Sequence, residues 1–192
     1  MALLESATFA LGVASASVII GTLLVTIFSS SWRFWPPGEL TWKYHLHWVC
    51  VGSFNVSLVG TAVFEWGTWV LPAPTKFVVG GVLAVVGVVV FTTSENSFER
   101  HETMGLAGDL HTSGLYARSR NPQYVGMIVG IVGFAVVVDS LLVTILALLH
   151  VSWVLLLPFA EEPWLQDEFG EEYRRYKQQV PRFVGVQTFR SE

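Results

Sequence analysis

Side chains that could bind a small molecule gather in two short stretches, one before and one after a long apolar hairpin. The first stretch ends in Arg120, Asn121 and Tyr124, and the second is the pair Glu161 and Glu162. An arginine can bind a carboxylate through two parallel hydrogen bonds, a glutamate can bind an ammonium group or sugar hydroxyls, and a tyrosine ring can attract a cation. These residue types suit a small molecule that carries charge. The simpler alternative is an ion pair in which Arg120 binds one of the two glutamates and only ties the hairpin together.

Long apolar blocks must position these residues. Of the 192 residues, 52% are hydrophobic and 14% are charged, against roughly a quarter charged in an ordinary soluble domain. The apolar residues form blocks long enough to cross about 30 Å of hydrocarbon. We therefore expect an all-α, polytopic membrane protein, a single integral-membrane domain over residues 1–192. The predicted transmembrane helices are five, at residues 7–28, 48–71, 77–93, 124–138 and 141–159.

The basic residues predict the orientation of these helices. Five spans put the loop 30–47, the loop 94–123 and the C-terminal tail on one side, and all of the eleven Lys and Arg except Lys76 fall there. The positive-inside rule then predicts an N-terminus outside and a C-terminus in the cytoplasm. Because Glu5, rather than lysines, precedes the first block, a transmembrane span is favoured over a cleaved signal peptide. Tryptophans near both ends of the first two spans predict interface belts: Trp32, Trp35, Trp42 and Trp48 near one end, and Trp66 and Trp69 near the other end of the second span.

The last two blocks and the tail determine where the polar stretches meet. Only Asp139 and Ser140 separate the two blocks, which predicts a tight C-terminal helical hairpin. Antiparallel helices about 8–10 Å apart would bring the polar stretches together at the cytoplasmic foot. The tail predicts an amphipathic helix, which we expect on the cytoplasmic interface; the alternative is a helix that caps a site. Its apolar face consists of Leu165, Phe169, Tyr173, Tyr176 and Val180.

Three motifs follow one another in the second half of the chain. They are TSGLYARSRNPQYVG from Thr112, the pair Glu161-Glu162, and FGEEYRRYKQQVPR from Phe169. These motifs resemble those of the isoprenylcysteine carboxyl methyltransferase and phospholipid methyltransferase superfamily. That family's pattern is GxY followed by RHPxYxG, a Glu-Glu pair after a hydrophobic hairpin, and FGxxYxxYxxxVPR. The resemblance implies an integral-membrane methyltransferase that uses S-adenosylmethionine, bound in a cytoplasm-facing pocket built from residues 105–126 and 160–185.

The resemblance also implies roles for individual residues. Leu157 stands where the prenylcysteine enzymes have an arginine for the substrate carboxylate, which argues against a prenylcysteine substrate. Asn121 replaces a common histidine and cannot titrate, although it keeps a donor and an acceptor. We expect methyl transfer to a lipid or another hydrophobic acceptor. By its location alone, and not from the resemblance, Glu162 is the candidate general base; the alternative is an amine acceptor that needs no base beyond solvent. The expected cofactor-binding residues are Leu110, His111, Gly114, Tyr116, Arg120, Asn121, Pro122, Gln123, Tyr124 and Glu161.

Other polar and small residues lie inside the predicted spans. Polar groups in a membrane are costly and often functional, so Asn55, Glu65 and His150 are candidate substrate residues; structural roles are the alternative. The glycines Gly126 and Gly130 give one helix a face on which another can pack closely. That face predicts helix packing, with oligomerisation as a further possibility.

Several classes of function are disfavoured. A net charge of -4 without a basic run argues against a nucleic-acid partner. His45 and His47 are two residues apart and share no helical face, so we expect no metal site. The single cysteine, Cys50, excludes a disulfide framework. Two alternatives to a methyltransferase stay open, an NADPH-dependent relative of the sterol reductases, whose chains are about twice as long, and a non-catalytic binding or transport protein.

Overall fold

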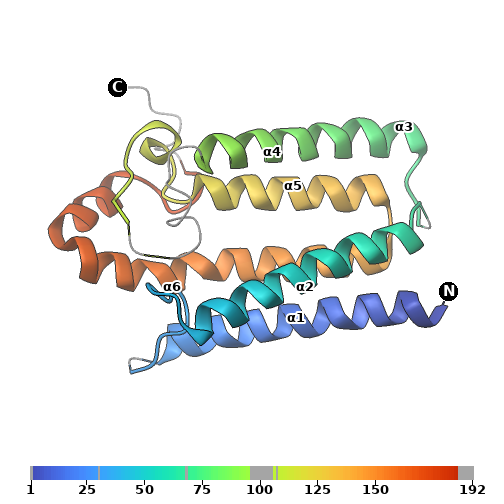
Figure 1. Ribbon diagram of the computed structural model, residues 1–192. Coiled ribbons are helices and arrows are strands. Elements are labelled where there is room, and N and C mark those ends of the chain that lie inside the picture. Colours follow the sequence, from blue (N-terminus) through green and yellow to red (C-terminus); the bar gives the residue numbers. More distant parts are fainter. Residues whose placement is uncertain (1, 30, 68, 96–105, 107, 186–192) are drawn as a thin grey trace.

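The computed structural model describes residues 2–29, 31–67, 69–95, 106 and 108–185, and in this part of the chain every regular element is a helix (Figure 1). Four helical segments are long and apolar enough to cross a membrane, and the 17-residue α5 is shorter. The predicted all-α membrane fold is therefore confirmed. The elements are α1 (Ala2–Phe28), α2 (Trp42–Phe64), α3 (Ala73–Thr75), the π-helical turn η1 (Lys76–Gly80), α4 (Gly81–Glu95), the 3-10 turn η2 (Gly114–Ala117), α5 (Pro122–Val138) and α6 (Leu141–Gln179).

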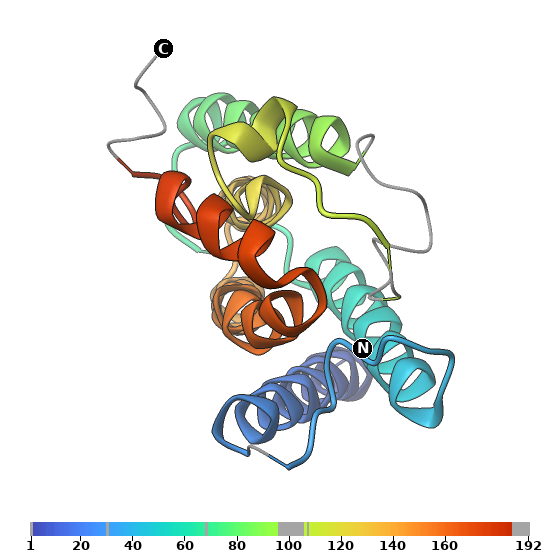
Figure 2. The same cartoon turned by 90° about the vertical axis from the view of Figure 1, so that its left-hand side faces the viewer.

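Two helical pairs lie on either side of α6 (Figures 1 and 2). One pair is α1 with α2, the other is α4 with α5, and α6 packs against both α1 and α5. The loop after α1, the segment that leads into α5 and the end of α6 all lie at one end of the bundle, as the span count predicts. We call this the site end. The N-terminus and the α5–α6 turn lie at the opposite end.

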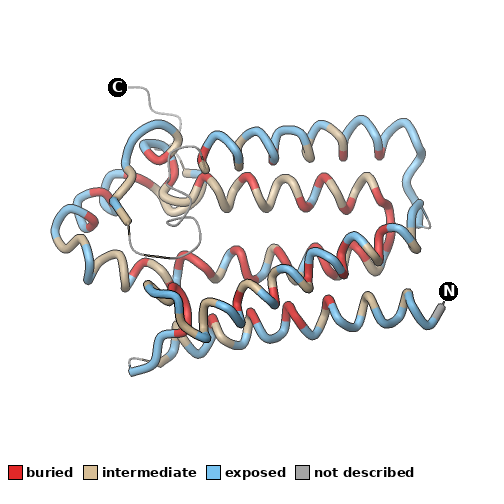
Figure 3. The backbone as a smooth tube through the Cα atoms, viewed as in Figure 1, coloured by how far each residue is buried: buried red, intermediate tan, exposed pale blue. Residues whose placement is uncertain are grey.

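The outward faces of the bundle are apolar. Figure 3 shows exposed residues along α4 and buried residues along the inward sides of α5 and α6. Exposed side chains of α4 include Val82, Val85 and Val89. A face of this kind is stable in hydrocarbon rather than in water, which agrees with a membrane-embedded protein.

Close backbone contact joins α4 to α5. A Cβ atom built on Gly87 would lie 2.2 Å from the backbone nitrogen of Gly130, and one on Gly126 would lie 2.5 Å from that of Phe91. Side chains at these positions would separate the helices, so glycine permits the contact. The helix-packing prediction for Gly126 and Gly130 is confirmed. The oligomerisation prediction is wrong for this face, because α4 of the same chain already covers it.

The second span ends earlier than the sequence predicts. Helix α2 stops at Phe64, and the chain then turns at Gly67, whose φ of +66° is in the left-handed region. Backbone N–H groups in this turn donate to the α5–α6 junction, from Gly67 to the Val138 carbonyl at 2.7 Å and from Trp69 to the Asp139 carbonyl at 3.0 Å. Gly67 and residues 69–71 therefore dock on the α5–α6 junction. Apolar composition by itself predicts a longer helix than the structure has.

The predicted hairpin between α5 and α6 is confirmed. Asp139 adopts a left-handed conformation (φ 55°) that ends α5, and Ser140 caps α6 by accepting from the Val143 N–H at 3.3 Å. The predicted span of 141–159 continues beyond its expected end to Gln179, with a change of direction at Gly170 (φ 54°). This break redirects the last turns of α6, residues 171–179, across the site end (Figure 2).

The apolar face of the tail helix packs on the protein. The buried side chains of Tyr173, Tyr176 and Val180 form a cluster with Leu165 and Phe169, to which Leu110 of the segment before α5 also belongs. The predicted apolar face is therefore confirmed, and its tyrosines are covered by the protein itself. The alternative, a helix that caps a site, describes the structure.

Candidate functional site

A cavity of about 140 Å³ opens at the site end. Its walls come from four parts of the chain: residues 35–36, residues 106 and 108–109, residues within 116–124, and residues within 161–169. A smaller cavity of about 70 Å³ shares the walls formed by Tyr116, Arg120 and Glu161. The α5–α6 hairpin and the folded-back tail thus enclose adjoining spaces around the polar stretches that the sequence singles out.

Glu161 is the acidic group in the wall of the larger cavity. One of its oxygens, Oε1, accepts from the Tyr124 hydroxyl at 2.6 Å and from the Trp35 indole Nε1 at 2.8 Å. Glu161 lies beyond the predicted span of 141–159. Burial raises its pKa to about 7, the neighbouring Glu162 charge adds to this, and the hydrogen bonds from Tyr124 and Trp35 oppose it. The carboxyl group therefore changes its charge near neutral pH.

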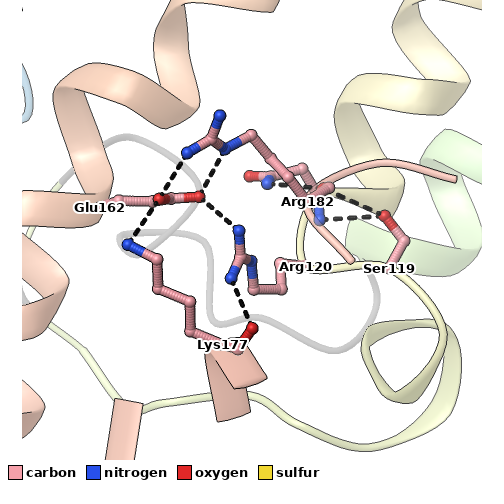
Figure 4. A network of polar contacts seen from close by, with 6 residues as sticks. Ser119, Arg120, Glu162, Lys177 and Arg182 are labelled. Carbon is pink, nitrogen blue, oxygen red and sulfur yellow. Dashed lines mark hydrogen bonds and ion pairs between the residues drawn. The ribbon is translucent and has the colours of Figure 1, made fainter. Parts of the chain in front are cut away.

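Glu162 has a different environment, shown in Figure 4. Its carboxylate accepts from Arg120 Nη2 at 2.8 Å and from Arg182 Nε at 2.7 Å and Nη2 at 2.8 Å, and Lys177 Nζ lies 3.3 Å away. Burial alone would raise the pKa of Glu162. The hydrogen bond from Arg182 and the charges of Arg120, Arg182 and Lys177 outweigh burial and lower the pKa.

This cluster does not support Glu162 as a general base. A carboxylate held between three cations stays ionised and is a poor proton acceptor. The contact between Arg120 and Glu162 corresponds to the structural ion pair that the sequence leaves as an alternative. The geometry favours Glu161 as the acid–base group, because Glu161 borders the larger cavity and has neutral partners.

The tail closes over the segment that leads into α5. The Tyr176 hydroxyl donates to the Tyr116 carbonyl at 2.7 Å, and the Arg120 backbone N–H donates to the Pro181 carbonyl at 2.9 Å. The Asn121 side chain donates to the Arg182 carbonyl at 2.9 Å. These bonds, together with the Glu162 cluster, connect segments some sixty residues apart and fix the cavity wall.

Most of the expected cofactor residues meet at these cavities. Tyr116, Arg120, Asn121 and Glu161 line both cavities. Gln123 and Tyr124 line the larger cavity, and Leu110 and His111 line the smaller one.

Two expected residues line neither cavity. Gly114 precedes Tyr116 in the 3-10 turn at a φ of +61°, and Pro122 is the first residue of α5. Both shape the backbone beside the site, since glycine readily adopts a positive φ and proline suits the first turn of a helix. Within the predicted segment 105–126, residues 105 and 107 lie outside the described residues.

The three candidate substrate residues, Asn55, Glu65 and His150, do not line either cavity. Asn55 lies on the exposed side of α2 and donates to the Val51 carbonyl at 2.9 Å. Glu65 follows α2 at the opposite end and accepts from the Ser140 hydroxyl at 3.2 Å. His150 is buried in the core, stacked on Trp153 at 4.6 Å between ring centroids. Asn55 thus bonds to the backbone of its own helix, Glu65 bonds to the α5–α6 junction, and His150 packs in the core, which suits structural roles.

Trp35 and Trp164 are cavity residues that the sequence analysis did not identify. Trp35 is assigned from sequence to an interface belt, but it is 4% exposed and bonded to Glu161. Trp164 follows the Glu161-Glu162 pair by one helical turn and so borders the same cavity. The helical spacing could have identified Trp164. No local signal identifies Trp35, whose contact partner is 126 residues away.

Comparison with known protein families identifies the chain. A family model described as phospholipid methyltransferase matches residues 75–172, 98 of the 192 residues. The chain belongs to the phospholipid methyltransferase family. No curated protein and no solved structure matches the chain significantly.

Family membership makes this protein a membrane methyltransferase and supports the resemblance found in the motifs. The matched region begins at α3 and ends just after Gly170, so it contains both Tyr124 and Glu161. Trp35 and Arg182 lie outside it. Membership disfavours the reductase and transport alternatives.

Proposed function

We propose that this phospholipid methyltransferase family member transfers a methyl group from S-adenosylmethionine to a membrane lipid at the larger cavity. The observation that carries the proposal is the position of Glu161. Its carboxyl group borders a cavity at the end of an apolar bundle, and its pKa of about 7 allows it to be charged or neutral under physiological conditions. The family and the bundle support the reaction class and the lipid setting.

The residues around the cavity fit this cofactor. S-adenosylmethionine carries an ammonium, a carboxylate, a sulfonium and ribose hydroxyls. Oε2 of Glu161 has no hydrogen bond within the described part of the chain and could accept from an ammonium or a hydroxyl. The buried Nε of Arg120 also has no partner among the described residues and is a donor suited to a carboxylate. The aromatic rings of Tyr124 and Trp164 can attract a cation.

The protein contributes alignment, exclusion of water and proton handling. The bound cofactor supplies an electrophilic methyl group by displacement from its sulfonium. Because charge disperses when an amine attacks, a cavity with low polarity favours the reaction, and fixed geometry contributes several kcal/mol. Glu161 can hold a proton from an ammonium headgroup on Oε2, since its pKa lies near the working pH.

The acceptor and the orientation belong to the same proposal. Leu157 is 6% exposed and replaces the arginine that the superfamily resemblance assigns to a substrate carboxylate, so a lipid amine is a better acceptor than a carboxylate. The distribution of basic residues supports a site end in the cytoplasm. Residues 105–126 and 160–185 form the proposed cofactor region, and residues 1–192 the proposed single membrane domain.

Calorimetry on the detergent-solubilised protein tests the cofactor. We expect S-adenosylmethionine to bind and NADPH to give no heat. Glu161→Gln should weaken binding about tenfold to a hundredfold, in line with the loss of a charged hydrogen bond. Glu168→Gln is the matched control, because Glu168 is an exposed glutamate on the same helix. Binding of NADPH alone, or equal behaviour of the two variants, would contradict the proposal.

Labelled cofactor tests the acceptor. Membranes that contain the protein are incubated with methyl-labelled S-adenosylmethionine, and the label is sorted among lipids, peptides and small thiols. We expect the label in amine-bearing lipids. Label in peptides or thiols would overturn the lipid acceptor and leave the methyltransferase activity in place.

A further inference from the structure

The loop between α1 and α2 reaches the candidate site from outside the family match. Its Trp35 lies in the wall of the larger cavity, 40 residues before the matched region begins. We infer that Trp35 is a positioning residue, whose indole N–H fixes one oxygen of Glu161 so that the other faces the ligand. This inference rests on the proposed function, in which Glu161 binds the cofactor or the acceptor.

The two hydrogen bonds to Glu161 meet on one atom. The Trp35 Nε1 donates to Oε1 at 2.8 Å and the Tyr124 hydroxyl donates to the same Oε1 at 2.6 Å. Tyr124 belongs to α5, whereas Trp35 comes from the first loop. Two donors on one oxygen define the rotation of the carboxyl group. Oε2, which has no partner among the described residues, then remains for the ligand.

The indole itself is held firmly by its surroundings. Its ring stacks on His47 of α2 with 3.9 Å between centroids and 21° between planes. The loop is attached to α1 because the Thr26 hydroxyl oxygen accepts from the Phe34 N–H at 2.9 Å. A bridge between Gly38 and Leu106 joins the loop to another segment of the cavity wall. Because the ring is stacked and its loop is attached to α1 and to the cavity wall, the indole N–H can orient an acceptor without large loss of side-chain entropy.

This arrangement makes the N-terminal helical pair part of the site. The region matched by the family supplies Glu161 and Tyr124, but only the first loop supplies the second donor. Removing the indole N–H while keeping an aromatic ring should free the carboxyl group to rotate. It should also destabilise the ionised form, because a carboxylate accepts a hydrogen bond more strongly than a neutral acid does.

The first test measures the contact without any cofactor. The protein is labelled with ¹⁵N-tryptophan in detergent micelles, and the indole N–H signals of its eight tryptophans are followed with pH. One signal should shift with a midpoint near 7, be missing in Trp35→Phe, and persist without that transition in Glu161→Gln. Trp42→Phe, which removes an exposed indole at the start of α2, should leave the transition unchanged. A Trp35 signal that does not respond to Glu161 would overturn the inference.

The second test measures the consequence for the ligand. Binding of S-adenosylmethionine is measured from pH 6 to 9 for the wild type, Trp35→Phe and Trp42→Phe. Trp35→Phe should weaken binding about tenfold near pH 7 and move the midpoint of its pH dependence upward. In the Glu161→Gln background the same substitution should have little further effect.

The two tests separate the two proposals. A uniform loss of binding with an unchanged midpoint would indicate a merely structural tryptophan and overturn the inference. A titrating Trp35 signal without any binding of S-adenosylmethionine would refute the proposed cofactor and leave the contact between Trp35 and Glu161 established.

Discussion

Each end of the bundle holds a carboxylate within the fold, but the two carboxylates differ in their hydrogen-bond and ion-pair partners. At the opposite end, Asp139 accepts from the backbone N–H groups of Val70 and Leu71 at 3.1–3.3 Å and lies 3.7 Å from Lys76 Nζ. At the site end, Glu161 has two neutral donors on a single oxygen and borders a cavity. Asp139 is buried among its partners, whereas Glu161 has an oxygen without a hydrogen bond among the described residues.

The difference teaches how to separate structural from functional carboxylates in this protein. Asp139 and Glu162 are saturated by partners of their own chain, and each holds a turn or tail in place. A saturated carboxylate has little left to offer a ligand. Glu161 combines an open oxygen with a cavity and a raised pKa, which are properties expected of a ligand-binding or acid–base group.

The largest expected effect is on stability, from Glu162→Ala. This change leaves Arg120 and Arg182 without their buried partner, and breaking a buried ion pair costs about 3–5 kcal/mol. Thermal unfolding in detergent should show a clearly lower midpoint than for the wild type. An unchanged midpoint would mean that the cluster in Figure 4 does not hold the tail, and Glu162 would then have to be reconsidered as a site residue.

Asp139→Asn should have the next largest effect. The amide removes the charge opposite Lys76 and weakens the acceptors for Val70 and Leu71, so we expect a loss of about 1–3 kcal/mol. Binding of S-adenosylmethionine should stay within twofold of the wild type. A large loss of binding, measured by calorimetry on the folded variant, would break the comparison between the two ends.

The pH dependence of binding should reflect Glu161. Its pKa is raised to about 7, so the carboxylate form is lost as pH falls below 7, and a ligand that needs this form binds more weakly there. Affinity for S-adenosylmethionine should be about tenfold lower at pH 6 than at pH 8. Glu161→Gln controls for titration of the cofactor itself. An equal pH dependence in both proteins would contradict the assignment.

The smallest effect is expected from Glu171→Gln. Glu171 pairs with Arg174 at 2.6 Å, but both side chains are more than half exposed. Exposed pairs of this kind contribute at most about 1 kcal/mol and often nothing measurable. We expect the unfolding midpoint to match that of the wild type within error. A shift as large as that of Glu162→Ala would show that burial is not what distinguishes these ion pairs.

The sequence predicts much of the fold, because long apolar blocks can be read locally. The helical hairpin around Asp139 and the helix around residues 77–93 are found where expected, whereas the end of α2 is misplaced by seven residues. Apolar composition does not reveal that residues 69–71 dock on Asp139, since this contact joins distant parts of the chain. Contacts between distant parts of the chain also decide the packing of the tail helix. The sequence predicts its apolar face correctly but does not predict that this face packs against the segment before α5.

For the site, the sequence by itself determines the chemistry and the motif residues, since their types and order lie within one stretch of chain. It identifies Arg120, Tyr124 and the glutamate pair, and the family match supports the reaction class. Only the tertiary structure decides that Glu162 is bound by three cations while Glu161 borders the cavity with Trp35. Neighbouring residues on a helix point about 100° apart, so two identical side chains meet different partners. Tertiary packing, which no local sequence pattern encodes, therefore decides which of the two glutamates can bind a ligand.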